Sequence, residues 1–292
     1  MEAGQGLMIR ECMSSSLENR PEPPKVSIVM TAFNADRYIE SSISAALAQD
    51  YANFEVVFLD DGSSDATENI CKAIKDPRFH YIRCERMGRS RALNEAIRRA
   101  SGDYIAINDA DDLSVSWRLS YVVGFLLDNP DVAIAATRYI STDIFPGTIP
   151  EISSQPAAAA GERPVSITVA RLYRSNPLVH STAIYPRSIW RRVKGYDESL
   201  EMCIDYDFFI RAMRHGGVVL LPLPTIIYYR NPSSFFKTKS SISYLHNLRI
   251  IRRRARTILP LPKWARIYDL IPWYAVIKWQ VMNFVRGSME QV

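Results

Sequence analysis

Cysteine is scarce in this sequence, and no long apolar run is present. The four cysteines are scattered, with no CxxC pair and no histidine at zinc-finger spacing. We therefore expect reduced thiols in a cytosolic protein, and neither a disulfide framework nor a structural zinc site. The most apolar stretch, residues 267–285, is interrupted by Asp269, Pro272 and Lys278, which argues against a membrane-spanning helix.

The first 24 residues also lack the apolar segment that a secretory signal peptide needs. Gly, Ser, Glu and Pro are frequent there, so the sequence predicts a disordered leader over residues 1–24. The remaining length is enough for one large domain with an appendage.

Basic residues are concentrated near the C-terminus. The chain has 36 Lys and Arg against 31 Asp and Glu, a formal charge of +5. Nine of the basic residues lie between Lys237 and Arg266, where there is no acid, so the other 27 are outnumbered by the 31 acids. No nucleic-acid-binding motif accompanies this charge, so a nucleic-acid partner is not expected.

Short apolar runs alternate with helical patterns through the first 110 residues. This rhythm, with crossovers of helix length, predicts an α/β protein with a mainly parallel sheet covered on both faces. Strands are expected at 25–30, 54–59, 80–83, 104–108, 132–137, 181–185, 218–221 and 225–229, and helices at 36–48, 66–74, 90–100, 117–129 and 205–214. A loop rich in Pro and Ala is expected over 146–164.

Acidic residues cluster where two of these strands end. Asp60 and Asp61 follow one apolar run, and Asp109, Asp111 and Asp112 follow another. Parallel sheets bind ligands at the carboxyl ends of their strands. Mg²⁺ and Mn²⁺ prefer oxygen ligands and share them with substrate phosphates. The pattern therefore predicts a divalent cation, Mn²⁺ or Mg²⁺, and a phosphorylated substrate, most simply a nucleotide.

Five motifs follow one another along the chain. They are VSIVMTAFN at 26–34, EVVFLDDGSSDAT at 55–67, RALN at 91–94 with GDYIAINDADD at 102–112, HST at 180–182, and GYD at 195–197 with IDYDFFIR at 204–211. In order and spacing these motifs resemble those of the family 2 glycosyltransferases, over about residues 25–230, and the resemblance implies the GT-A fold with a nucleotide-sugar donor. Together with the composition of the two ends, it predicts a leader (1–24), a GT-A domain (25–235) and a basic, amphipathic helical extension (236–292).

The resemblance assigns roles to individual residues of the donor site. Asp61 would accept the N3–H of a uracil or thymine ring, and Thr31, Ala32 and Phe33 would line the base. Asp60 either joins this site or fixes its turn. Apart from the resemblance, Arg91, or Arg89 beside it, could reach the diphosphate as a charged donor, and a solvated surface arginine is an equal alternative. Asp109 and Asp111 would contact the donor, and Asp111 and Asp112 would hold the metal ion, which stabilises the departing nucleoside diphosphate.

Transfer with inversion needs a base that takes the proton of the acceptor hydroxyl. The family supplies an aspartate from a Glu-Asp pair at a helix start, and here the pair is Ile204-Asp205. Asp205 is therefore the predicted base, although capping of the helix would also explain it. His180, Trp190 and Tyr196 are candidates for contacts with the acceptor or the sugar, and core packing is an equal alternative for each.

The C-terminal segment leaves two interpretations open. Arginines alternate with apolar residues between Arg249 and Leu259, and Trp and Tyr follow. Such a segment suits a helix in the membrane interface on the cytoplasmic face, at 240–285, or a helical subdomain packed on the body or in a homodimer.

The favoured function is an inverting, metal-dependent glycosyltransferase that uses a nucleotide diphosphate sugar, with UDP preferred. Its acceptor would be a saccharide or a lipid-linked saccharide, and surface polysaccharide its product. The alternative is a catalytically silent nucleotide- or carbohydrate-binding protein on the same fold. A nucleotidylyltransferase would need a Gly-rich phosphate loop after the first strand, and a processive synthase would need transmembrane helices; the sequence has neither.

Overall fold

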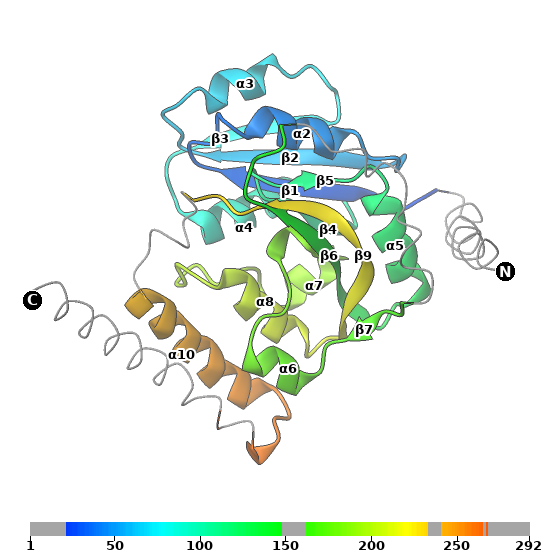
Figure 1. Cartoon of the computed structure of the whole chain (residues 1–292), viewed down its shortest axis with the longest axis vertical. Helices are drawn as coiled ribbons and strands as arrows, with labels where there is room; N and C mark the ends of the chain where they lie inside the picture. The colour runs from blue at the N-terminus through cyan, green and yellow to red at the C-terminus, as the bar shows by residue number, and fades with distance from the viewer. Residues whose placement is uncertain (1–21, 148–161, 233–240, 265–266, 268–292) are drawn as a thin grey trace, which may run out of the picture.

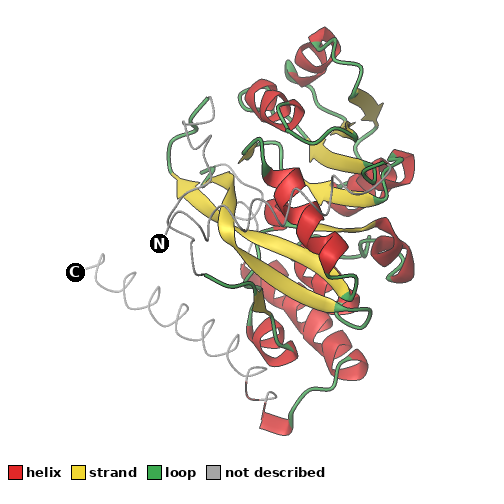
Figure 2. Ribbon diagram, turned by 90° about the vertical axis from the view of Figure 1, so that its right-hand side faces the viewer, coloured by secondary structure: helices red, strands yellow, loops and turns green. Residues whose placement is uncertain are grey.

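The protein folds around one mixed β-sheet with helices on both faces (Figure 1, Figure 2). This computed structural model describes residues 22–147, 162–232, 241–264 and 267. Nine strands form the sheet in the order β3-β2-β1-β4-β8-β6-β9-β5, with β7 paired to β9. The predicted leader (1–24) falls almost wholly outside the described residues, as do 233–240 and nearly all of the chain from 265 onward.

The first half is a parallel βαβ arrangement, as the sequence predicts. Strands β1, β2, β3 and β4 pair in parallel, so their carboxyl ends meet at one edge. Long apolar runs such as VSIVMTA suit strands that are buried on both sides. The elements are β1 Val26–Ala32, α2 Ile39–Leu47, β2 Phe54–Asp61, α3 Thr67–Ala73, β3 Phe79–Cys84, α4 Arg89–Arg99 and β4 Tyr104–Ile107.

The second half turns the sheet into a mixed one. Strand β8 runs antiparallel to both β4 and β6, whereas β6 and β9 are parallel to each other. The elements are β5 Leu113–Ser114, α5 Arg118–Asp128, β6 Val132–Thr142, β7 Val165–Ser166, α6 Val169–Arg174, the 3₁₀ turn η2 His180–Thr182, β8 Ile184–Pro186, α7 Arg187–Arg192, α8 Ile204–Ala212 and β9 Gly217–Tyr229.

Two predictions in this half are wrong in detail. Two strands were expected in 218–229, but β9 is continuous, and its prolines fall where the register with β6 shifts between Thr137 and Arg138. Proline lacks the N–H that a regular ladder needs, so the irregularity accommodates it. Residues 181–182, expected in a strand, form the turn η2, and β8 is correspondingly short.

Alternate residues of the central strands point into two separate cores. Ile28 and Val56 pack with α2 and α5 on one face, whereas Val29 and Leu59 pack with α4, α8 and the C-terminal helix on the other. A strand places successive side chains on opposite faces, so this division follows from the strand geometry.

The C-terminal helix α10, Ser241–Ile258, belongs to the second core. Its Leu248, Ile251 and Ala255 are buried there with α8 side chains, and Figure 1 shows α10 lying along the body beside α8. Of the predicted basic cluster, Arg252 is buried and donates to the carbonyl of Arg174 (3.1 Å). No helix among the described residues is long and apolar enough to cross a bilayer.

Candidate active site

The acidic residues lie where the sheet topology places them, along the edge formed by the ends of β1, β2 and β4. Strand β1 lies between the other two, so the acids that end β2 and those that follow β4 flank it on either side. The segment that leads into α4 crosses between the two acid groups.

The two acids that end β2 have different surroundings. Asp60 is fully buried, and its oxygens accept from the backbone N–H of Ser63 (2.8 Å) and the hydroxyl of Tyr81 (2.9 Å). It fixes the turn, the second of its two predicted roles, and the geometry does not favour contact with a ligand. Asp61 accepts from the backbone N–H groups of Met87 (2.7 Å) and Gly88 (3.1 Å), so it ties β2 to the start of α4.

Phe33 forms the outer wall at the end of β1. Its ring is 43% exposed, which excludes a core role. The guanidinium of Arg86 lies 3.6 Å from the ring centroid and also donates to Asp61 (2.8 Å). Thr31 is half-buried and Ala32 is buried behind this wall. An aromatic face, a cation and a carboxylate acceptor thus stand together, which suits a planar base with a ring N–H.

Arg89, at the start of α4, is the centre of the charged site. Its Nη2 donates to Asp109 (2.6 Å) and to Nδ1 of His180 (3.3 Å). The side chain is 40% exposed, so the guanidinium lies at the surface of the site. Burial would lower the pKa of Arg89, but the charges of Asp109, Asp205 and Asp111 raise it instead. The acids from β4 and from α8 therefore converge on one guanidinium.

The three acids after β4 divide into ligand-facing and structural groups. Burial raises the pKa of Asp111, and the charge of Asp109 adds to it, whereas the amide of Asn231 donates to Asp111 (3.1 Å) and opposes the shift. Asp112 is fully buried, and it accepts hydrogen bonds from the hydroxyl of Ser181 and from the backbone N–H of Tyr229 (3.2 Å). Both oxygens of Asp112 are occupied, so the geometry favours Asp111 alone as a direct metal ligand.

His180 is 6% exposed and joins the site to the core. Arginine can only donate, so Nδ1 accepts from Arg89 and the proton of a neutral ring is on Nε2. Nε2 then donates to the hydroxyl of Tyr196 (2.8 Å). Burial lowers the pKa of His180, although the charge of Asp109 opposes this shift. The ring is therefore neutral near pH 7 and orients Arg89.

Asp205 lies in the first turn of α8, as predicted. It is half-buried, and one oxygen accepts from the amide of Asn176 (2.8 Å). Cys203, the residue before the helix start at Ile204, has a left-handed backbone (φ 57°). Asn176 and Asn231 give no sequence signal, because each orients an acid distant in the chain.

Two predicted contacts are not placed in this site. Arg91 points away along α4 and pairs with Glu198 (3.3 Å), so Arg89 takes the position proposed for an arginine. Trp190 donates to the side chain of Asn94 (3.1 Å) and lines a separate cavity of about 650 Å³ with the 193–198 loop.

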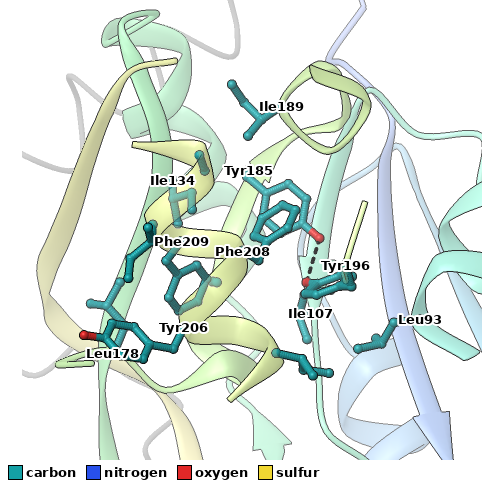
Figure 3. Close-up of a cluster of buried hydrophobic side chains, with 14 of the residues drawn as sticks. Leu93, Ile107, Ile134, Leu178, Tyr185, Ile189, Tyr196, Tyr206, Phe208 and Phe209 are labelled. Carbon is teal, nitrogen blue, oxygen red and sulfur yellow. Dashed lines mark hydrogen bonds between the residues drawn. The ribbon is translucent and has the colours of Figure 1, made fainter. Parts of the chain in front are cut away.

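Tyr196 is also a core residue rather than a surface for a sugar. It is 2% exposed, stacks on Phe208 (4.6 Å between centroids) and shares a hydrogen bond with Tyr185 (3.0 Å). Figure 3 shows this pair of hydroxyls within the packed cluster. Its contribution to the site is indirect, through the hydrogen bond with His180.

The carboxylate ligands of the site suit a divalent cation that also binds the phosphates of a substrate. Among the described residues, no three His, Cys, Asp or Glu side chains converge into a ready-made metal centre. Magnesium sites commonly use one or two carboxylates, several waters and substrate phosphates. Asp111 is a half-exposed carboxylate that accepts from the neutral amide of Asn231 and forms no salt bridge with the described residues, so it suits that role.

Comparison with known proteins identifies the class. The model of glycosyl transferase family 2 matches residues 27–190, so the chain belongs to this family and is a glycosyltransferase. EpsE of Bacillus subtilis, assigned as a glycosyltransferase, is 29% identical over 82% of this chain and 84% of its own length. The UDP-Glc:alpha-D-GlcNAc-diphosphoundecaprenol beta-1,3-glucosyltransferase WfgD of Escherichia coli is 38% identical over 105 residues, 36% of this chain and 42% of WfgD.

The solved structures confirm the fold. The mannosyltransferase PcManGT of Pyrobaculum calidifontis, in complex with GDP-Man and Mn²⁺, covers 99% of this chain and 88% of its own length with a TM-score of 0.62. At 17% identity this likeness establishes the fold alone. The chain thus has the GT-A fold, as the motifs predicted.

Proposed function

We propose that this protein transfers a sugar, with inversion, from a nucleotide diphosphate donor to a saccharide or lipid-linked acceptor, using Mn²⁺ or Mg²⁺. The observation that carries the proposal is the contact of Arg89 with Asp109 (2.6 Å) and His180 (3.3 Å), at a position where the charges of Asp205 and Asp111 also raise the pKa of Arg89. Acids from the donor side and the acceptor side of the chain surround one cation. The reacting bond would lie between them.

The residues divide the work as follows. Phe33 and Arg86 would hold the base. Both oxygens of Asp61 already accept hydrogen bonds, from Arg86, Met87 and Gly88, so the ring N–H would have to replace one of these donors. Asp111 would hold the metal ion, which stabilises the negative charge of the leaving diphosphate. Arg89 supplies a fixed positive charge beside it, with Asp109 and His180 holding its guanidinium in place.

Asp205 would remove the proton from the acceptor hydroxyl. Asn176 occupies one oxygen and fixes the carboxylate, and the other oxygen accepts no hydrogen bond from the described residues. An oriented carboxylate with one free oxygen can take a proton at hydrogen-bond distance. Inversion requires this attack from the side opposite the leaving group.

Donor turnover tests the proposal. Release of nucleoside diphosphate from UDP- and GDP-sugars, with and without Mn²⁺, should be metal-dependent in the wild type and fall at least a hundredfold in Asp111→Ala and Asp205→Asn. Glu95→Gln is the matched control, because Glu95 pairs with Arg98 and Arg99 on the surface of α4. Metal-independent turnover, or full activity in Asp205→Asn, would refute the assigned roles, and donor binding without turnover would favour a silent binding protein.

A lipid-linked acceptor and a place on the cytoplasmic face of the membrane complete the proposal. WfgD, by its name, acts on a diphosphoundecaprenol acceptor. In this chain Arg249, Arg253 and Arg256 are exposed on α10, and each would contribute about 1 kcal/mol near an anionic surface. Reversing these three charges should abolish flotation with anionic liposomes while leaving the fold intact; flotation equal to wild type would exclude this surface.

A further inference from the structure

Arg118, the first residue of α5, is one of the largest fully buried side chains among the described residues. It lies behind the strand-end acids and is 0% exposed. Burial lowers its pKa to about 9, and only the charge of Asp112 opposes the shift. A buried cation is costly unless hydrogen bonds and an opposite charge compensate it, so its partners indicate what it is for.

Those partners belong to the two segments that present the site. The guanidinium donates to the carbonyl of Ile107, the last residue of β4 (2.8 Å), and to the side chain of Asn108 (3.2 Å). It also donates to the carbonyl of Ser181 in the turn η2 (2.6 Å). One planar group thus joins the end of β4, two residues before Asp109, to the turn that carries His180.

A second contact closes the connection from the other side. The hydroxyl of Ser181 donates to Asp112, and the amide of Asn108 donates to the carbonyls of Asp109 (3.0 Å) and Asp112 (3.2 Å). The acid loop 108–112 and the turn 180–182 are therefore held at two points, by Arg118 and by Asp112.

We propose that Arg118 is a positioning residue for sugar transfer, and that with Ser181 and Asp112 it forms a clamp that sets Asp109, Asp111 and His180 relative to one another. The proposal rests on the function proposed above for those three residues. Arg118 itself is closed off from any ligand, so its effect must pass through them.

The geometry explains why an arginine stands there. Two of its nitrogens reach three acceptors on two segments, which the single nitrogen of lysine cannot reproduce. Its hydrogen-bond acceptors are neutral, and no salt bridge joins Arg118 to an acid among the described residues. Burying a charge without an ion partner is costly, so stability alone gives little reason to keep it. An apolar residue could not hold the loop of Asp109 and Asp111 in place, because it offers no hydrogen bonds.

Arg118→Lys tests the clamp, with Arg187→Lys as the matched control. Arg187 also donates to two backbone carbonyls, those of Ile97 (3.0 Å) and Arg98 (3.2 Å), and also has an Nε without a partner, but it lies outside the site. Ser181→Ala is a gentler second variant, because it removes only the hydroxyl that holds Asp112.

Two readouts separate positioning from simple loss of stability. The ring signals of the four histidines, followed by NMR, report on His180 without any ligand. Mn²⁺ binding in the presence of UDP or GDP, followed by the loss of the free-Mn²⁺ signal in electron paramagnetic resonance, reports on Asp111. Residues that hold a metal ligand in place typically change metal affinity 10- to 100-fold when they are replaced.

We expect Arg118→Lys and Ser181→Ala to shift the His180 signal and to weaken Mn²⁺ binding at least tenfold, with nucleotide binding in the absence of metal unchanged. Arg187→Lys should change neither. A His180 signal at its wild-type position in both variants would overturn the clamp, as would an equal loss of Mn²⁺ affinity in Arg187→Lys. Absence of Mn²⁺ binding in the wild type would instead count against the proposed function, because the histidine signals would still report the clamp.

Discussion

Asn94 on α4 makes four hydrogen bonds while it is only 4% exposed. Its amide donates to the carbonyl of Tyr196 (2.9 Å) and to Glu198 (3.0 Å), and its oxygen accepts from the backbone of Tyr196 (2.8 Å) and from Trp190. A Cβ on Gly195 would lie 2.5 Å from that same oxygen. The side chain therefore fixes the 195–198 loop, whose Tyr196 hydroxyl orients His180.

Asn94→Ala should cost about 3–4 kcal/mol of folding free energy. The truncation strands two buried groups, the N–H and C=O of Tyr196, at about 1–3 kcal/mol each, and the half-buried Nε1–H of Trp190, at less. Water entering the space will recover part of the sum, and losses above about 4 kcal/mol are exceptional. For a chain of this size, about 2 °C per kcal/mol gives a fall in Tm of about 6–8 °C.

Urea unfolding and thermal melts measure the loss, and Asn129→Ala is the control. Asn129 makes one such bond, to the carbonyl of Phe125 (2.8 Å), so its removal should cost about 1 kcal/mol. Asn94→Asp keeps the oxygen that accepts hydrogen bonds and loses the amide group that donates two. On this ground its loss of stability should lie between those of Asn129→Ala and Asn94→Ala, and repulsion between the new carboxylate and Glu198 would increase it. The reasoning fails if Asn94→Ala is no less stable than Asn129→Ala. If folded Asn94→Ala keeps the wild-type kcat, the link from Tyr196 to His180 carries no catalytic weight.

Two further predictions concern stability. Although burial opposes ionisation, hydrogen bonds from Lys25, Ser101 and Ser27 lower the pKa of Glu55 from 4.5 to about 2, so its stabilisation is complete above pH 4.5 and is lost as the pH falls towards 2. Glu55→Gln should therefore lose about 3 kcal/mol at pH 7, and urea titrations at descending pH should show the gap to wild type closing; a constant gap would contradict this. Arg254 on α10 pairs with buried Asp207 and with Asp197 (2.6 Å). Arg254→Met should cost about 2 kcal/mol, below the usual penalty for breaking a buried pair because Arg211 still neutralises Asp207 and Arg254 is partly exposed. Exposed Arg253→Met on the same helix should cost no more than about 0.5 kcal/mol, and equal losses in denaturant melts would show that the Arg254 pairs are not what holds α10.

The strands and helices of the first half follow from periodicity, since each is a continuous apolar run or a helical stripe closed by turn residues.

The sequence leaves a site residue ambiguous where a neighbour in the chain could play the same chemical role. Arg89 and Arg91 are two positions apart, so they face different sides of α4, and only the packing against η2 and the 195–198 loop decides which one meets the acids. Asp111 and Asp112 are likewise adjacent, and the hydroxyl of Ser181, from a distant segment, makes Asp112 structural.

The roles of Trp190 and Tyr196 could not be predicted from the sequence. Aromatic residues near acids suit sugar stacking and core packing equally, because the same flat apolar face serves both. Tyr196 is buried because its ring stacks on Phe208 and its hydroxyl shares a hydrogen bond with Tyr185. These partners belong to α8 and β8, which are other elements than the loop of Tyr196. Sequence patterns carry no information on such long-range pairs.

The packing of α10 changes how the C-terminal segment relates to catalysis. Its Arg254 reaches Asp197 in the 195–198 loop and Asp207 in α8, and these two elements carry Tyr196 and Asp205. The same helix exposes Arg249, Arg253 and Arg256 on its outer face. A helix that is bound on one face to the elements of the site and offers a basic surface on the other is fixed relative to Asp205 and His180. An anionic membrane surface that bound α10, as proposed above, would therefore hold Asp205 and His180 at a set orientation, which an acceptor held in that surface requires.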